Sequence, residues 1–246
     1  MERYAGRVAM VTGASSGIGA AVSRALLQRG VTVVGVDLRP DRMKGWQLKD
    51  YTGQLHPLYG DVSDEESILS VFKWITDNLG GVDILVNSAG LFRNSGLISA
   101  PLSEWKLMLD VNVLGLSICT REAVQDMLSR GVDDGFIVNL CSLAGHIPIG
   151  DSRNSMYYAS KVAVKTLLEG IRKDLVARKS NIRVGQISPG CVKTEIFNAA
   201  TGLPDNFWDS HFLEPDDIAQ AVIFMLSQHP RVQVHDIIIR PTGSHP

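Results

Sequence analysis

The sequence predicts an α/β fold in which a doubly wound, seven-stranded parallel sheet is flanked by helices. Three observations predict it: Val- and Ile-rich runs alternate with longer segments of helical spacing, seven such runs can be counted, and glycines directly follow the first of them. The chain of 246 residues, 45% hydrophobic and 20% charged, is large enough to bury one substantial core. We therefore expect a single domain over residues 1–246, with ligands bound outside the carboxyl ends of the strands.

The first strand and helix set the pattern for the others. Residues 7–12 (RVAMVT) form an apolar run typical of a buried strand. After the glycines, Ile18, Val22 and Leu26 recur at helical spacing and form one apolar stripe. Gly30 is expected to end that helix.

The following segments repeat the alternation of strand and helix. Residues 31–36 and 55–59 are expected as strands, separated by a polar stretch for which no order is predicted. Ser63 or Asp64 is expected to cap the next helix. Gly115, in the middle of a later helix, indicates close packing or a local kink. The remaining elements are strands at 83–86, 136–141, 182–187 and 234–239 and helices at 103–130, 155–179 and 216–227.

The region of about 194–213 interrupts this alternation. It mixes Phe197, Phe207, Trp208 and Phe212 with Gly, Pro and Asn, and its length of roughly twenty residues exceeds that of an ordinary connection. We interpret it as a mobile lid or substrate loop. The alternative is an irregular but rigid loop that its aromatic side chains hold on the surface.

Composition and charge exclude several classes of function. The formal net charge of −2, from 24 basic and 26 acidic residues, provides no field to hold a nucleic acid or a membrane surface. No apolar run approaches the roughly 18 residues of a membrane span, and the amino terminus lacks a signal-peptide pattern, so we expect a cytoplasmic protein. Three widely spaced cysteines without nearby His pairs indicate free thiols and no metal site.

The glycine-rich segment TGASSGIG lies in the turn between the first strand and the first helix. Glycines let the backbone turn tightly and approach a phosphate, while the free N–H groups and the dipole of the helix N-terminus favour a pyrophosphate. The spacing GxxxGxG in this position predicts a dinucleotide site of the Rossmann type. The residues expected to contact the dinucleotide are Gly13, Ser15, Ser16, Gly17, Ile18 and Gly19.

The choice of dinucleotide is expected to depend on the end of the second strand. Asp37 lies there, where a carboxylate can accept hydrogen bonds from a ribose diol and would repel a 2′-phosphate. We therefore expect NAD as the preferred cofactor. NADP stays open, because Leu38 and Arg39 follow and the guanidinium could pair with a 2′-phosphate.

Tyr157 and Lys161 form the candidate reacting centre. They are four residues apart on an expected helix, so both side chains share one face. A phenol with an ordinary pKa of about 10 is a poor base, and we expect the ammonium, aided by a positive nicotinamide ring, to lower that pKa. Ser142, after the fifth strand, can donate to a substrate oxygen beside Tyr157. Tyr158 has Val162 as its i+4 neighbour and is expected to be a packing residue.

These motifs together resemble the short-chain dehydrogenase/reductase superfamily over essentially the whole chain. TGASSGIG, NSAG (87–90), Asn112, Ser142, YYASK and SPG (188–190) occur in the order of that family. One departure is Ser88, where the family usually has a second Asn. The resemblance implies a nicotinamide-dependent alcohol dehydrogenase or carbonyl reductase in which Tyr157 transfers the proton.

The resemblance also implies further site residues. Asn112 would hold a water that passes protons through Lys161. The dinucleotide would be contacted by Asp61 and Val62 at the adenine, by Asn87, Ala89 and Gly90 on the adenosine side, and by Pro189, Gly190, Val192 and Thr194 around the nicotinamide.

Within that family, residues 111–123 and 139–146 are most similar to the dehydrogenase/reductase member 11 and farnesol dehydrogenase branch. That similarity implies a small hydrophobic alcohol or ketone as substrate, isoprenoid or steroid-like, although the branch generally favours NADP. The alternatives are a 3-oxoacyl thioester reductase and a catalytically silent binding protein of the same fold. Relatives commonly associate through their long helices, so a homo-dimer or homo-tetramer is also implied.

Overall fold

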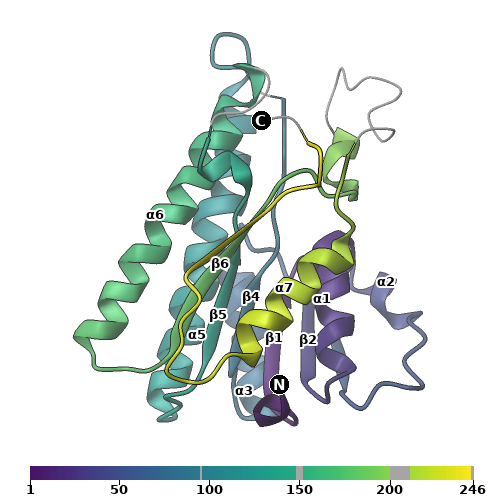
Figure 1. Cartoon of the computed structure of the whole chain (residues 1–246), viewed down its shortest axis with the longest axis vertical. Coiled ribbons are helices and arrows are strands. Elements are labelled where there is room, and N and C mark those ends of the chain that lie inside the picture. Colours follow the sequence, from purple (N-terminus) through teal and green to yellow (C-terminus); the bar gives the residue numbers. More distant parts are fainter. Residues whose placement is uncertain (95, 148–151, 200–210, 245–246) are drawn as a thin grey trace.

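The computed structural model describes residues 1–94, 96–147, 152–199 and 211–244, and its centre is one parallel sheet (Figure 1). The sheet has seven strands in the order β3-β2-β1-β4-β5-β6-β7. This arrangement confirms the predicted doubly wound fold: the strand order reverses between β1 and β4, where such sheets bind ligands. The strands are β1 (Val8–Thr12), β2 (Thr32–Asp37), β3 (Leu55–Tyr59), β4 (Ile84–Asn87), β5 (Phe136–Leu140), β6 (Arg183–Pro189) and β7 (Asp236–Ile239).

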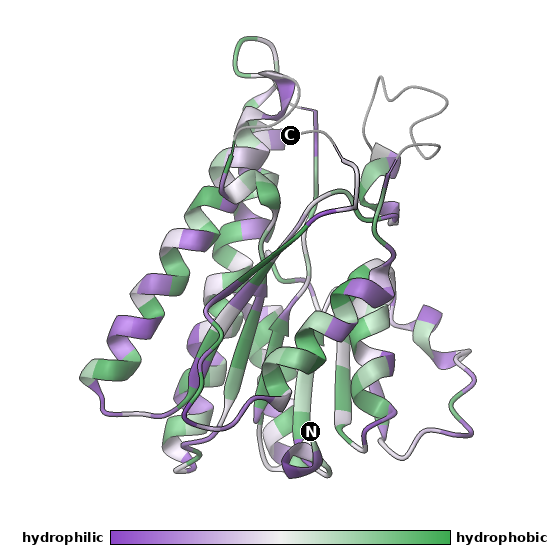
Figure 2. Cartoon of the chain, viewed as in Figure 1, coloured by the Kyte–Doolittle hydropathy of each residue, from purple (hydrophilic) through white to green (hydrophobic). Residues whose placement is uncertain are grey.

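Helices cover both faces of the sheet. One face packs against α1 and α7, through residues such as Leu26 and Val222, and the other against α3, α5 and α6, through residues such as Ile68, Cys119 and Leu168. Figure 2 shows the strands coloured as hydrophobic and α6 with alternating hydrophilic stretches. The helices are α1 (Gly17–Leu27), α2 (Asp41–Lys44), α3 (Glu65–Leu79), α4 (Leu102–Leu109), α5 (Leu116–Ser129), α6 (Ser155–Ala177) and α7 (Pro215–Ser227).

The expected helix at 103–130 is divided in the structure. Between α4 and α5 the chain forms a wider, π-helical turn, η2 (Asp110–Gly115). A side chain on Gly115 would lie 2.6 Å from the carbonyl oxygen of Val62, so Gly115 permits the helix to pass close to the end of β3. The predictions of a helical pattern over 103–130 and of close packing at Gly115 are confirmed, and the π-helical turn is a local change of winding within that helical segment.

Local capping explains other element ends. Asp64 caps α3 by accepting a hydrogen bond from the backbone of Glu66 at 3.2 Å, which decides between the two expected caps. The short helix α2 falls within the polar stretch for which no order was predicted. Short 3-10 turns complete the described elements: η1 (Glu2–Tyr4), η3 (Leu143–Gly145), η4 (Ser152–Asn154) and η5 (Glu195–Ala199).

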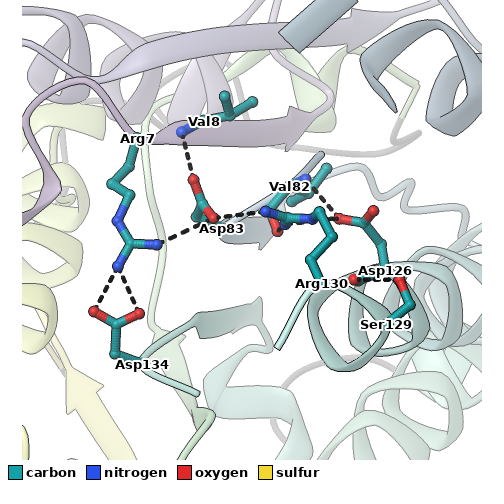
Figure 3. Close-up of polar contacts among 8 residues, drawn as sticks. All are labelled: Arg7, Val8, Val82, Asp83, Asp126, Ser129, Arg130 and Asp134. Atoms are coloured by element: carbon teal, nitrogen blue, oxygen red, sulfur yellow. Dashed lines mark hydrogen bonds and ion pairs between the residues drawn. The ribbon is translucent and has the colours of Figure 1, made fainter. Parts of the chain in front are cut away.

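A polar network lies at the amino end of the sheet, opposite the expected site (Figure 3). Asp83, directly before β4, accepts a hydrogen bond from the backbone N–H of Val8 at 3.0 Å and pairs with Arg7 at 3.2 Å and Arg130 at 3.3 Å. Arg7 also pairs with the exposed Asp134. The network therefore connects β1, β4 and the end of α5 through one buried carboxylate.

The region expected as a substrate loop is described only in part. Phe207 and Trp208 lie outside the described residues. Phe197, in η5, has its ring 5.9 Å from that of Phe92, and Lys193 Nζ lies 4.7 Å from the centre of the Phe212 ring. Among the described helices, none is long and apolar enough to cross a membrane.

Candidate active site

A cleft opens at the carboxyl ends of the central strands, beside the glycine turn. Its volume is about 510 Å³. It extends from the ends of β2 and β3, across the turn, to the segment after β4 and the beginning of η5. The predicted site residues that line it are Gly13, Ser16, Gly17, Ile18, Gly19, Asp37, Leu38, Arg39, Asp61, Val62, Ala89, Gly90 and Thr194.

The glycine turn needs its glycines for steric reasons. Gly13 and Gly17 have φ values of 66° and 50°, in the left-handed region that other residues rarely adopt. A side chain on Gly19 would lie 2.2 Å from the carbonyl oxygen of Gly13. Because the turn ends at the first residue of α1, the free N–H groups of that helix face the cleft and can bind an anion.

Ser15 provides a further indication of an anionic ligand. Its hydroxyl is buried and has no hydrogen-bond partner among the described residues, although its backbone N–H donates to Asp37 Oδ2 at 3.1 Å. A buried hydroxyl without a partner is uncommon, because its desolvation is costly. A phosphate oxygen bound on the turn would supply the missing partner, so the turn fits the pyrophosphate of a dinucleotide.

Asp37 is held rigidly at the edge of the cleft. One carboxylate oxygen accepts from Ser15 as above, and the other accepts from the backbone N–H of Arg39 at 2.9 Å. The residue is only 9% exposed. Its carboxylate therefore keeps one orientation, with free lone pairs that can accept from a ribose diol.

Ser142, Tyr157 and Lys161 converge next to this cleft. The first two turns of α6 present Tyr157 and Lys161 on one face, and Lys161 Nζ lies 5.7 Å from the centre of the Tyr157 ring. Ser142 precedes η3, where its hydroxyl accepts a hydrogen bond from the backbone of Ala144 at 3.1 Å and lies within hydrogen-bonding reach of the Tyr157 phenol. The three side chains are thus brought together as expected from the sequence.

Burial dominates the electrostatics of this group. Burial raises the pKa of Tyr157 to about 12, and the hydrogen bond with Ser142 offsets only part of that effect. Burial also lowers the pKa of Lys161. The ammonium donates to the carbonyl oxygen of Leu140 at 3.0 Å, at the end of β5. For the chain by itself desolvation therefore dominates the pKa of Tyr157, and the lowering expected from Lys161 together with a bound nicotinamide stays a prediction.

Asn112 connects three segments around the reacting group. It is buried in η2, where its Oδ1 accepts from the backbone N–H of Leu91 and its Nδ2 donates to the Leu91 carbonyl, both at 2.9 Å. The same Nδ2 donates to Ser160 in α6 at 3.1 Å. A side chain on Gly90 would lie 3.4 Å from Asn112 Oδ1 and 3.9 Å from Lys161 Nζ. Asn112 therefore holds the Gly90 turn against α6.

Besides the reacting residues, five of the expected cofactor contacts do not line the cleft: Ser15, described above, and four others. Asn87 is buried in the sheet, where it donates to Thr120 Oγ1 and Asn139 Oδ1, both at 2.9 Å. Val192 is 5% exposed and belongs to the hydrophobic core. Pro189 is the last residue of β6, and Gly190 follows it. Gly190 packs against Pro241. These four residues therefore belong to the packed structure next to the cleft and do not line it.

Phe92 is a site residue that the sequence interpretation missed. Its ring meets the Tyr157 ring edge-on, with centres 5.0 Å apart, and it also lines the cleft. It thereby forms the contact between the dinucleotide cleft and the reacting group. Its place two residues after Gly90, an expected cofactor contact, was the signal in the sequence that could have identified it.

Tyr158, the neighbouring tyrosine, accepts a hydrogen bond from Asn154 at 3.2 Å.

Comparison with known proteins identifies a family and relatives that match most of this chain. A family model described as short chain dehydrogenase matches residues 7–202. Dehydrogenase/reductase SDR family member 11 of Gallus gallus is 45% identical, over 98% of this chain and 98% of that protein. Farnesol dehydrogenase of Aedes aegypti is 42% identical, over 99% of each chain.

Solved structures with the same fold include two described with an NADP-type ligand. The closed form of a serine dehydrogenase complexed with NADP+ has a TM-score of 0.86 and 28% identity, covering 97% of this chain and 96% of that one. An alcohol dehydrogenase from Thermococcus sibiricus, complexed with 5-hydroxy-NADP, has a TM-score of 0.84 and 26% identity, with 98% of each chain covered.

Proposed function

Because this chain belongs to the short-chain dehydrogenase family, we propose that it transfers a hydride between a nicotinamide dinucleotide and a small hydrophobic alcohol or carbonyl compound. The chain is an NAD(P)-dependent oxidoreductase of that family. The observation that carries the finer proposal is the convergence of Ser142, Tyr157 and Lys161 beside a cleft of about 510 Å³.

The dinucleotide would be held mainly by the glycine turn and by Asp37. The turn offers the helix N-terminus and the unpartnered Ser15 hydroxyl to the phosphates, and Asp37 offers a fixed carboxylate to the adenosine ribose. The bound nicotinamide supplies the hydride chemistry. Ala89 and Gly90 also line the cleft.

Tyr157 is proposed as the proton-transferring group at the substrate oxygen. With a pKa of about 12 its phenol keeps its proton at neutral pH, so in the reductive direction it can donate that proton to the developing alkoxide. Ser142 donates a hydrogen bond to the same oxygen and holds it beside the phenol. Lys161 places a positive charge behind the pair, and Asn112 positions α6 through Ser160.

An apolar substrate is proposed because aromatic rings border the reacting group. Phe92 contacts Tyr157, and Phe197 contacts Phe92 from the beginning of the 194–213 segment, which we propose as a substrate loop. The similarity to a farnesol dehydrogenase supports the same class of substrate. An isoprenoid or steroid-like alcohol would match this lining.

NAD is proposed as the preferred cofactor. Asp37 is the support, since its buried carboxylate would repel a 2′-phosphate. Relatives of known structure have been solved with NADP-type ligands, so both dinucleotides belong in any assay.

We also propose that residues 1–246 act as one catalytic domain, in the cytoplasm, as a homo-dimer or homo-tetramer. Exposed apolar side chains on α6, Val162, Leu167 and Val176, support self-association.

The experiment that tests this proposal compares Tyr157→Phe with wild type and with Tyr158→Phe as a matched control. Wild type is expected to reduce ketones and isoprenoid aldehydes with loss of reduced nicotinamide absorbance, and to oxidise the corresponding alcohols with its appearance. Tyr157→Phe should lose turnover by about 10²- to 10⁴-fold while its dinucleotide Kd, measured calorimetrically, stays unchanged. Tyr158→Phe should keep most of the activity. Near-normal rates in Tyr157→Phe would eliminate the assignment, and no absorbance change with either cofactor would refute the enzymatic proposal.

A further inference from the structure

An ion-pair cluster at the cleft joins residues that are far apart in the sequence. Glu195, the first residue of η5, accepts from Arg42 NH1 through both carboxylate oxygens, at 2.8 and 3.1 Å. Arg39 NH1 lies 3.7 Å from the same carboxylate. Arg39 Nε also lies 3.9 Å from Asp37 Oδ1. Two carboxylates and two guanidinium groups therefore alternate at the end of β2.

The position of this cluster matters for the dinucleotide. Asp37, Arg39 and Glu195 all line the cleft. The carboxylate at the end of the second strand is where a Rossmann-type site meets the adenosine ribose, and a nearby Arg is the group that accommodates a 2′-phosphate. Glu195, from η5, thus pairs with the guanidinium groups that could otherwise bind a 2′-phosphate.

We propose that Glu195 is a specificity-determining residue that selects NAD against NADP. This inference rests on the proposed function and deepens it. A guanidinium pairs with a carboxylate or a phosphate through the same donors, so the Glu195 carboxylate competes directly with a 2′-phosphate for Arg39 and Arg42. NAD binds with these pairs intact. For NADP to bind, the ion pairs of Glu195 with Arg39 and Arg42 must break. The Glu195 carboxylate would also repel the nearby 2′-phosphate.

The expected effect is moderate because the cluster is half exposed. The side chains of Arg39, Arg42 and Glu195 are 52%, 43% and 49% exposed. Exposed ion pairs contribute little, so removing the competing carboxylate should tighten NADPH binding by about three- to tenfold. NADH carries no 2′-phosphate, and its affinity should change by less than about twofold.

The test measures Kd for NADPH and NADH by calorimetry, without substrate, on wild type and Glu195→Gln. Asp41→Asn is the matched control. It removes the same charge from α2, but Asp41 pairs with Lys44 at 2.6 Å and does not line the cleft. A double variant, Glu195→Gln with Arg42→Gln, tests whether any gain depends on the released guanidinium. Circular dichroism verifies that all variants are folded.

The inference predicts that Glu195→Gln tightens NADPH selectively, that Asp41→Asn produces less than half of that change, and that the double variant loses most of the gain. Equal effects of Glu195→Gln and Asp41→Asn would overturn it, because net charge alone would then explain the change. An unchanged ratio of the NADPH and NADH Kd values in Glu195→Gln would also overturn it and leave the proposed function standing. Failure of wild type to bind either dinucleotide would refute the proposed function and this inference with it.

Discussion

The buried phenol of Tyr157 makes a quantitative prediction about stability at alkaline pH. Its pKa is raised from 10.0 to about 12 in the folded chain, chiefly by burial. Between these two values the folded state holds a proton that the unfolded state releases. The contribution of Tyr157 to stability is therefore fully present below pH 10 and is lost as the pH rises toward 12.

The magnitude follows from the two pKa values. At about pH 11 the unfolded phenol is mostly ionised and the folded phenol mostly protonated, which costs about 1–2 kcal/mol of unfolding free energy relative to neutral pH. Tyr157→Phe removes the ionisable phenol and leaves every other ionisable group of the chain in place. Between pH 8 and pH 11 the unfolding free energy of this variant should thus fall by about 1–2 kcal/mol less than that of wild type.

Urea unfolding followed by circular dichroism at both pH values measures this double difference. The other tyrosines and the lysines are present in both proteins, so their contributions cancel. Equal pH dependence in the two proteins would refute the reasoning. It would mean that the phenol ionises at its ordinary pKa and that water or Lys161 compensates the cost of burial.

Three further predictions concern the rest of the molecule. Gly19→Ala should abolish dinucleotide binding in a calorimetric titration, because the added methyl would lie 2.2 Å from the Gly13 carbonyl oxygen; retained binding would contradict the steric argument. Asp83→Ala should lower the unfolding free energy by about 2–4 kcal/mol in urea, against less than about 1 kcal/mol for the exposed Asp134→Ala, and similar losses would show that burial is unimportant there. Asp37→Ala should shift the ratio of NAD to NADP catalytic efficiencies toward NADP, whereas an unchanged ratio would assign the preference to other groups.

Much of the fold could be predicted because its signals are local. Apolar runs and helical stripes identified all seven strands of the sheet and most helices, since each element must bury one face regardless of its partners. The glycine turn was evident for the same reason, as its backbone conformation tolerates few other residues. The π-helical turn at Asp110–Gly115 was not predicted, because it depends on how closely Gly115 approaches Val62.

The sequence by itself determined the doubly wound fold, the glycine turn and the identity of the candidate reacting residues. Only the tertiary structure decided how those residues interact with groups far along the chain. It turned Lys161 toward Leu140, placed Phe92 against Tyr157 and brought Glu195 to Arg42. The physical reason is that periodicity reports which face of an element is buried, whereas desolvation and charge pairing depend on what lies opposite that face once the chain has folded.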